Sequence, residues 1–95
     1  MSAFLVVDTK INNPEAYEEY KKLARPIVEK FGGVYRARGG AMEIHQSELW
    51  SPTRIVIVEF PDVESAQTFI DSEEYAPVKQ MRLDNAECTL FILEG

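Results

Sequence analysis

The sequence has 95 residues, a formal net charge of −6 at pH 7 and 45% apolar residues. This length fits a single domain, residues 1–95, and the apolar content is too high for an intrinsically disordered chain. The acidic balance excludes the basic stripe that a nucleic-acid-binding surface needs. No segment approaches the roughly 20 apolar residues that span a membrane, and the N-terminus lacks the basic start of a secretory signal, so we expect a cytoplasmic protein.

The residues that hold metals and disulfides are scarce. The chain has one cysteine and one histidine, which excludes an internal disulfide and leaves a metal site unsupported. Cys88 lies in an apolar run and is interpreted as a small hydrophobic residue of the core. We therefore expect no metal and no cofactor.

The first third of the chain predicts a strand followed by a helix. Residues 3–9 are apolar and β-branched, as is typical of a strand. Asn13 can cap a helix whose first position is Pro14, and Gly32-Gly33 ends it. Pro26 lies inside this helix and predicts a kink. One helix face carries apolar and aromatic residues at steps of three and four: Tyr17, Tyr20, Ala24, Ile27, Val28 and Phe31.

The middle of the chain predicts two further strands. Val34–Arg38 is extended, Gly39-Gly40 permits a bulge, and Ala41–Glu48 continues the strand. After a turn at Trp50–Pro52, the segment Arg54–Phe60 is the strongest strand pattern in the sequence.

The last third predicts helical segments and a final strand. Asp62 can cap a helix that buries Val63, Ala66, Phe69 and Ile70. Ser72 can cap a further short helix, which Asn85 closes, and residues 86–93 form the last strand. The resulting order is that of a ferredoxin-like βαββαβ fold, an α+β arrangement with a four-stranded antiparallel sheet.

Three of the predicted strands are apolar on both faces. In the strand at residues 54–60, Ile55 and Ile57 point one way while Val56 and Val58 point the other. Helices on crossover connections cover only one face, so about seven large side chains stay uncovered, each worth roughly 1.5–3 kcal/mol on burial. We expect a homodimer that joins these sheet faces, with Trp50 as an anchor in it or as a lid over a hairpin.

Short motifs spread over the chain form one combined pattern. They are Tyr17-x-x-Tyr20, Pro26, Gly32-Gly33-x-Tyr35-x-x-Arg38-Gly39-Gly40, Trp50-x-Pro52-x-Arg54-x-Val56-x-x-Glu59-Phe60-Pro61, and Ser72-x-Glu74-Tyr75 with Arg82. This pattern resembles the domain-of-unknown-function 1330 family and covers nearly the whole chain. Membership implies a dimeric α/β barrel, in which two ferredoxin-like sheets face each other.

The resemblance implies a fold more than an activity. The superfamily is similar in fold to cofactor-free monooxygenases of aromatic polyketides, haem-degrading proteins and muconolactone isomerases, but the family itself has no settled activity. The chain departs from the family pattern at His45–Leu49, where Leu-Glu-Gly is expected, and at Phe69–Asp71, where an aromatic pair is expected. A site built on those positions would be altered here.

Two residues are candidates for acid–base catalysis. His45 carries the side chain type that most readily exchanges a proton near neutral pH, although a solvated histidine on an edge strand is the alternative. Glu59 lies at the end of an apolar strand face, where burial would raise its pKa and an arginine would lower it. A structural ion pair with Arg36 or Arg38 is the alternative for Glu59.

Arginines and tyrosines are candidates for ligand binding. Arg38 and Arg54 can hold a carboxylate through two parallel hydrogen bonds, or can lie solvated at the rim of the sheet. The tyrosines can line a cavity for a flat aromatic ligand, or can pack in the core. These tyrosines are Tyr17, Tyr20, Tyr35 and Tyr75.

Two functions stay open at this level, and the sequence does not decide whether the protein is an enzyme. The first is a homodimer that binds a small organic acid or aromatic metabolite, with or without transforming it as a cofactor-independent monooxygenase or isomerase. The second is a non-enzymatic dimeric binding or stress-associated module. A cavity on the order of several hundred cubic ångströms with convergent polar groups favours the first, and a filled core with Glu59 in a salt bridge at the rim favours the second.

Overall fold

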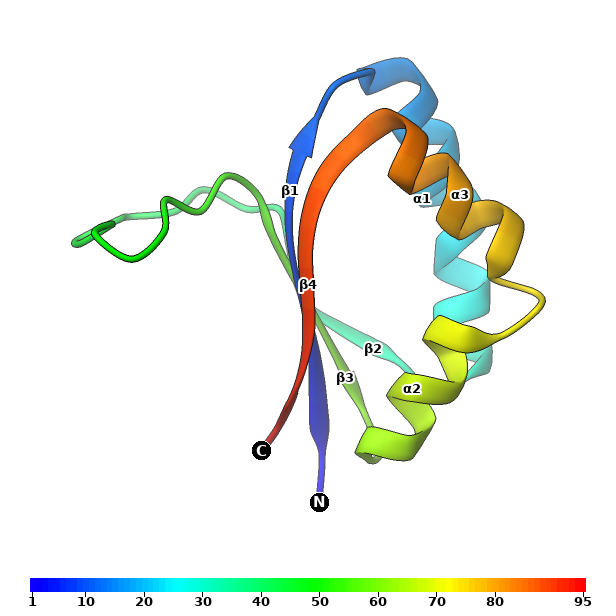
Figure 1. The fold of residues 1–95 in the computed structure, drawn as a ribbon. Coiled ribbons are helices and arrows are strands. Elements are labelled where there is room, and N and C mark those ends of the chain that lie inside the picture. The colour runs from blue at the N-terminus through cyan, green and yellow to red at the C-terminus, as the bar shows by residue number, and fades with distance from the viewer.

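The computed structural model describes the whole chain, residues 1–95, as a four-stranded sheet with three helices on one of its two faces (Figure 1). The elements in chain order are β1 (Ala3–Ile11), α1 (Pro14–Lys30), β2 (Val34–Arg38), β3 (Ile55–Phe60), α2 (Val63–Asp71), α3 (Ala76–Asn85) and β4 (Ala86–Glu94). The strands follow the order β2-β3-β1-β4, and every neighbouring pair is antiparallel. The predicted ferredoxin-like arrangement is confirmed.

The first two helices begin at the residues that the sequence predicts. The Asn13 side chain accepts a hydrogen bond from the Ala16 amide at 3.2 Å, and Asp62 accepts one from the Ser65 amide at 2.7 Å. α1 continues as a single helix through Pro26. None of the three helices combines the length and the apolar character that a membrane crossing requires.

The third helix begins later than predicted. The Ser72 hydroxyl accepts a hydrogen bond from the Tyr75 amide at 3.2 Å and donates one to the Phe69 carbonyl at 2.8 Å, so it stabilises a turn. α3 itself starts at Ala76. Tyr75 therefore lies between two helices, where its ring packs against Phe69 with the ring centroids 4.3 Å apart.

The core lies between the helices and one face of the sheet. Alternate residues of β1 from Ala3 to Thr9 are buried, as a strand with one covered face requires. Gly33 brings the end of α1 close to the sheet, because a Cβ there would lie 2.6 Å from Val28 Cγ1 and 2.9 Å from Val58 Cγ1. The core cluster consists of Leu5, Val7, Ala24, Ile27, Val28, Val58, Phe60, Ala66, Phe69, Tyr75 and Val78.

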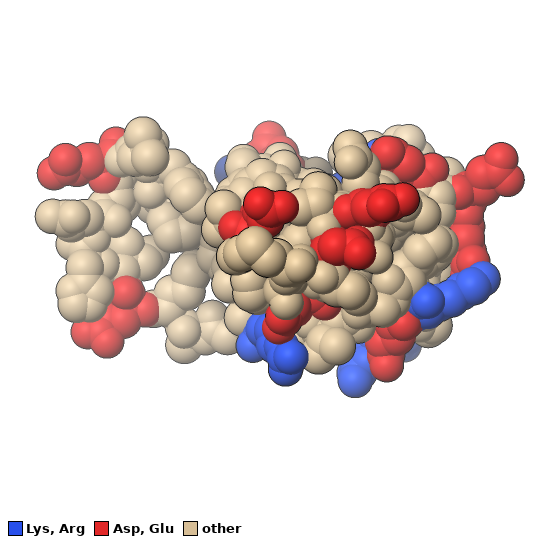
Figure 2. All heavy atoms as spheres, turned by 90° about the horizontal axis from the view of Figure 1, so that it is seen from below, with Lys and Arg blue, Asp and Glu red and all other residues tan.

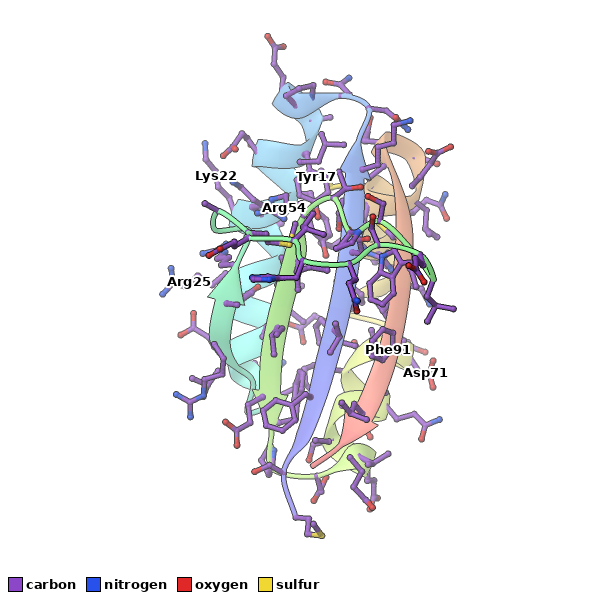
Figure 3. All side chains as sticks on the ribbon, turned by 90° about the vertical axis from the view of Figure 1, so that its left-hand side faces the viewer. Tyr17, Lys22, Arg25, Arg54, Asp71 and Phe91 are labelled. Carbon is purple, nitrogen blue, oxygen red and sulfur yellow. The ribbon has the colours of Figure 1, made fainter.

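The other face of the sheet, here called the open face, has no helix over it (Figures 1 and 3). Its apolar side chains stay partly exposed; Phe91 is 38% and Leu93 55% exposed. From the strand registers, the apolar side chains of this face are Phe4, Val6, Ile55, Ile57, Phe91 and Leu93. The apolar pattern on both strand faces therefore corresponds to one covered and one uncovered side.

The predicted strand at Ala41–Glu48 is wrong. Gly39 has a φ of +71°, and there the chain turns out of the sheet into a long loop on the side of the open face (Figure 1). We call residues 40–53 the arm; it contains neither helix nor strand. Because the chain leaves the sheet at Gly39, residues 41–48 pair with none of its strands. His45, expected on an edge strand, lies in this arm.

Replacing Gly33 with alanine is expected to destabilise the fold by about 1–3 kcal/mol, because the added methyl group overpacks the contact with Val28 and Val58. Gly40→Ala is the matched control, since no atom lies within 4 Å of the position its Cβ would take. The control should leave stability unchanged or raise it by up to about 1 kcal/mol. Urea denaturation followed by circular dichroism measures both, and equal effects would contradict the close approach at Gly33.

Candidate functional site

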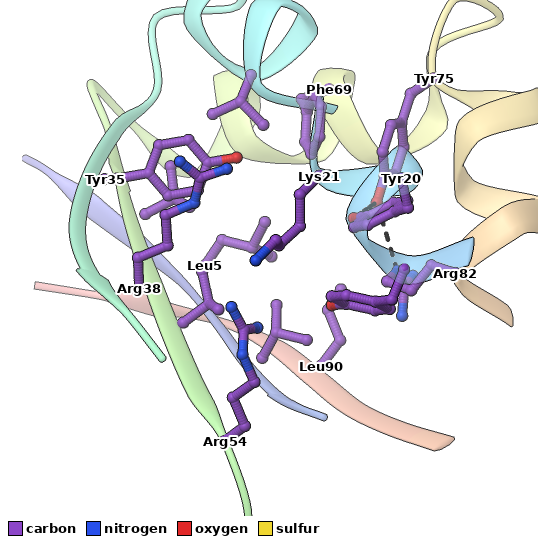
Figure 4. A pocket seen from close by; sticks show the side chains of 15 residues that line it. Leu5, Tyr20, Lys21, Tyr35, Arg38, Arg54, Phe69, Tyr75, Arg82 and Leu90 are labelled. Carbon is purple, nitrogen blue, oxygen red and sulfur yellow. Dashed lines mark hydrogen bonds between the residues drawn. The ribbon is translucent and has the colours of Figure 1, made fainter. Parts of the chain in front are cut away.

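A cavity of about 50 Å³ lies between the helices and the covered face of the sheet (Figure 4). One water needs roughly 10–15 Å³ of such space, so the cavity accepts a group of about four non-hydrogen atoms. This is far smaller than a site that encloses a whole drug-sized ligand. Its lining consists of Leu5, Val7, Tyr17, Tyr20, Lys21, Val28, Tyr35, Arg38, Arg54, Val56, Val58, Phe69, Tyr75, Arg82 and Leu90.

A wider groove of about 760 Å³ adjoins the cavity and shares Lys21, Arg38 and Arg54 with it. These three residues form what we call the mouth. Arg38 is the last residue of β2 and Arg54 directly precedes β3, so the two arginines stand at the two ends of the arm. The groove is lined by Glu18, Lys21, Lys22, Arg25, Pro26, Glu29, Arg38 and Arg54.

Both mouth arginines stack on tyrosines. The guanidinium carbon of Arg38 lies 4.6 Å from the centroid of the Tyr35 ring, and that of Arg54 lies 5.6 Å from the centroid of the Tyr17 ring. Neither arginine forms an ion pair with a carboxylate. A stacked guanidinium uses its face for the ring, so its N–H edge stays free to bind an anion.

Two contacts fix the position of Arg54. The Asp8 carboxylate accepts hydrogen bonds from the backbone amides of Arg54 at 2.9 Å and Thr53 at 2.8 Å, and from the indole N–H of Trp50 at 2.6 Å. Gly39 leaves room for the guanidinium, because a Cβ there would lie 2.5 Å from Arg54 Nε. The backbone and the side chain of Arg54 are thus held separately.

The floor of the cavity is a polar cluster of Tyr20, Tyr75 and Arg82 (Figure 4). The two tyrosine hydroxyl oxygens are 2.7 Å apart, and Arg82 Nε donates to the Tyr75 hydroxyl at 3.4 Å. Arg82 is only 4% exposed. Burial alone would lower the pKa of Arg82, but the neighbouring Tyr75 and Cys88 raise it above its ordinary value, so the guanidinium stays charged.

The lining of the cavity carries four cationic side chains and no aspartate or glutamate. This contrasts with the net charge of −6 of the chain. Acidic side chains are spread over the face of the molecule seen in Figure 2, and the basic ones in view lie mostly toward its lower edge. Burial raises the pKa of Tyr17, Tyr20 and Tyr35, so their hydroxyls stay protonated at neutral pH. The cavity therefore offers hydrogen-bond donors and positive charge.

The structure brings all five predicted ligand-binding residues to this one cavity. Tyr17 and Tyr20 come from α1, Tyr75 from the turn before α3, and Arg38 and Arg54 from the mouth. The sequence left open whether the tyrosines pack in the core or line a cavity. Tyr17 and Tyr75 do both, since they are buried and also line the cavity. Their role toward a ligand stays a prediction.

The two predicted catalytic residues lie outside the cavity. Glu59 is on the open face, where its carboxylate accepts a hydrogen bond from Arg36 Nε at 2.9 Å. Hydrogen bonds from Ser2 and Arg36 lower the pKa of Glu59. His45 is exposed in the arm, and its Nε2 lies 3.6 Å from a carboxylate oxygen of Glu43. The structure does not place either residue near the mouth.

Sequence reasoning did not propose Arg82 and Lys21 as site residues, although both line the cavity. A signal for Arg82 was present: it follows the apolar Val78 by four residues, so both lie on one face of the helix. Lys21 follows Tyr17 by four residues and shares its helix face for the same reason. In both helices, a charged residue on an otherwise apolar face indicates a candidate site residue.

The chain contains no group of three or more histidine, cysteine, aspartate or glutamate side chains that could hold a metal ion.

No curated protein matches the sequence. The family model described as "Domain of unknown function (DUF1330)" matches residues 2–95. The protein belongs to the DUF1330 family. The resemblance of its motifs to that family is confirmed.

Solved structures share the fold of this DUF1330 protein at low identity. The RPA0582 protein of unknown function from Rhodopseudomonas palustris is 18% identical with a TM-score of 0.77, over 99% of this chain and 82% of that one. A dimeric ferredoxin-like protein of unknown function from Jannaschia sp. CCS1 is 13% identical with a TM-score of 0.69, over 100% of both chains. SnoaB, a cofactor-independent oxygenase from Streptomyces nogalater, is 8% identical with a TM-score of 0.68, over 99% of this chain and 92% of that one.

Acidification is expected to release Trp50 from Asp8. Burial raises the pKa of Asp8, but hydrogen bonds from Trp50, Arg54 and Thr53 outweigh it and hold the pKa below the ordinary 3.8. The stability that this contact contributes is fully present at a pH above the ordinary pKa of Asp8. It is lost as the pH falls through the lowered pKa of the folded protein. Trp50 is the only tryptophan, so its emission should shift to longer wavelength in that range.

The variant Asp8→Asn is the control for this titration. It should show the shifted emission already at neutral pH and no further transition on acidification. Far-UV circular dichroism, recorded in parallel, separates release of the arm from global unfolding. Identical fluorescence titrations of the two proteins would contradict the role of Asp8.

Proposed function

We propose that this DUF1330 protein is a homodimer that binds a small organic acid at the cavity of each protomer. The observation that carries the proposal is the pair of mouth arginines, Arg38 and Arg54, which have no carboxylate partner above a tyrosine-walled cavity. The nearby carboxylates are already engaged, because Glu18 pairs with Lys21 at 2.8 Å and Glu29 with Arg25 at 3.0 Å. A carboxylate of the ligand supplies the missing partner.

The dimensions of the site restrict the size of the acid. The enclosed volume of about 50 Å³ accepts about four non-hydrogen atoms, and any bulkier part lies in the groove of about 760 Å³. Val56, Leu90 and the tyrosine rings provide the apolar surface for the enclosed part. The site therefore suits a short or slim organic acid, with its carboxylate at the mouth.

Exchanging either mouth arginine for glutamine is expected to weaken binding of small carboxylates. A charge-assisted hydrogen bond contributes about 1.5–3 kcal/mol, so Arg38→Gln and Arg54→Gln should each raise the Kd about tenfold or more. The matched control is Arg36→Gln, on the same strand as Arg38 but paired with Glu59 on the open face. Isothermal titration calorimetry with butyrate, benzoate and phenylacetate measures the effect.

Two results would contradict the binding proposal. One is that none of these acids binds the unaltered protein. The other is that Arg36→Gln weakens binding as much as Arg38→Gln does, because the loss would then reflect general surface charge and not the mouth.

The homodimer rests on the apolar open face. A monomer with such a surface would expose a patch of the kind that marks an interaction site. Two of the solved structures with this fold are described as dimeric, from Jannaschia sp. CCS1 and Bacteroides fragilis. The arm lies on the same side, and Leu49 in it is 94% exposed. We place the partner protomer against the open face, with Trp50 at the edge of the contact.

The variant Phe91→Asp is expected to dissociate this dimer, because it places a charge within the apolar contact. Analytical ultracentrifugation at micromolar concentration should give twice the chain mass of 10.8 kDa for the unaltered protein and the single mass for the variant. Leu83→Asp is the control, since Leu83 is 51% exposed on α3 in the helix layer, and it should stay dimeric. A monomeric unaltered protein would overturn this part of the proposal.

The composition of the cavity favours binding without catalysis over acid–base catalysis. The lining contains no aspartate, glutamate, histidine or cysteine, so nothing there can act as a general base at neutral pH. Its cationic and hydroxyl groups can stabilise a negatively charged oxygen. The likeness to SnoaB is one of fold alone and does not carry its activity over. Catalytic roles for His45 and Glu59, a cytoplasmic location and independence from cofactors stay predictions.

A further inference from the structure

The floor of the cavity contains a cation without a counter-ion. Arg82 is 4% exposed and lines the cavity, yet it takes part in no ion pair. Its hydrogen bond to the Tyr75 hydroxyl is long, at 3.4 Å, and the Cys88 side chain is its other hydrogen-bonding neighbour. A buried charge is costly unless it is paired, so proteins seldom keep one in this condition.

No carboxylate of the chain lies within ion-pair distance of Arg82. On the elements that pack around Arg82, Glu18 pairs with Lys21, Asp84 accepts a hydrogen bond from Gln80, and Glu87 lies 3.9 Å from Lys10. None of these carboxylates lines the cavity. Arg82 therefore has no counter-ion within the chain, and an anionic ligand can supply one.

The two tyrosines beside Arg82 leave one hydroxyl proton free. Tyr20 and Tyr75 share a single hydrogen bond of 2.7 Å, in which either can be the donor. Two hydroxyls have two protons and this bond uses one, so whichever way it points, one proton remains for a ligand. Together with the unused N–H groups of Arg82, the floor presents donors and no free charge of opposite sign. That is the chemistry of an oxyanion site.

This donor cluster lies apart from the mouth. The labelled side chains in Figure 4 show Arg38 and Arg54 on one side of the cavity and Arg82 with Tyr20 and Tyr75 on the other. Apart from Tyr17, Lys21 and Tyr35, the rest of the lining is apolar and consists of Leu5, Val7, Val28, Val56, Val58, Phe69 and Leu90. Two cationic ends in a cavity with a largely apolar lining match a ligand with two anionic ends joined by a hydrocarbon spacer.

We propose that Arg82, Tyr75 and Tyr20 bind a second carboxylate, so that the ligand of this cavity is a small dicarboxylate. This rests on the proposed function and names its substrate class. One carboxylate binds Arg38 and Arg54 at the mouth, and the other binds the floor. The volume of about 50 Å³ accepts a carboxylate and a short spacer, which limits the ligand to short chains.

The test compares linear dicarboxylates of four to eight carbons with their own monomethyl esters, by titration calorimetry at fixed ionic strength. Each ester keeps the length of its acid and removes one charge. In the unaltered protein, the best dicarboxylate should bind about tenfold to a hundredfold more tightly than its ester, as a charge-assisted hydrogen bond predicts. In Arg82→Met this preference should fall to about twofold or less, whereas Arg36→Gln should leave it unchanged.

The stability of the ligand-free protein provides a second, independent readout. Replacing a buried, unpaired charge with an apolar side chain of similar length is neutral or stabilising, so Arg82→Met should melt at the same or a higher temperature. A structural arginine would give the opposite result, and a clear loss of stability would overturn the proposal. Tyr75→Phe removes only the hydroxyl and should reduce the preference in the same direction, which provides a test if Arg82→Met does not fold.

The outcomes distinguish a failure of the floor site from a failure of acid binding at the mouth. If acids and esters bind equally and Arg82→Met changes neither, the floor site is wrong and the binding of acids at the mouth stands. If neither acids nor esters bind, both proposals fall. A preference for dicarboxylates that survives Arg82→Met and Tyr75→Phe would place the second carboxylate in the outer groove and overturn the floor site.

Discussion

All three helices lie on the same face of the four-stranded sheet, and this one-sided packing determines where each other feature lies. Burial of a large apolar side chain contributes roughly 1.5–3 kcal/mol, so the covered face supplies most of the stability of so small a domain. The cavity is a gap in that same layer. The open face keeps the remaining apolar side chains at the surface, where a second protomer can use them. The proposed ligand site and the proposed dimer contact thus lie on opposite sides of one sheet.

The covered face combines a hydrophobic core with a polar site. Tyr75 is 2% exposed and belongs to the core cluster, and its hydroxyl also belongs to the floor of the cavity. Arg82 adds a positive charge to the same layer. Polar groups in a core reduce stability unless they are satisfied, and residues kept despite that cost are commonly functional. The conflict between packing and polarity therefore marks the site more clearly than the size of the cavity does.

Much of the fold could be predicted from the sequence because periodicity reports burial directly. The alternation in β1, the helical spacing of Tyr17 and Tyr20, and the caps at Asn13 and Asp62 all lead to the observed elements. The gathering of the five predicted ligand-binding residues at one cavity follows from that topology.

Three features could not be predicted, each for a physical reason. A strand at Ala41–Glu48 depends on pairing with another strand, which local sequence does not reveal. Glu59 lies on a strand that is apolar on both faces, so its parity does not tell which face the helices cover. Arg82 carries a charge, and hydrophobic patterning places charges at the surface by default. In each case the missing information was tertiary.

The charge distribution has a kinetic consequence. The cationic mouth belongs to a molecule that is otherwise strongly acidic, with a net charge of −6. At physiological ionic strength, charges are screened beyond about 8 Å, so a dissolved anion meets repulsion over most of the surface and attraction only within that distance of the groove. For the proposed anionic ligand, productive encounters are therefore confined to a narrow range of approach directions, and added salt should change both how often they occur and how long the anion stays bound.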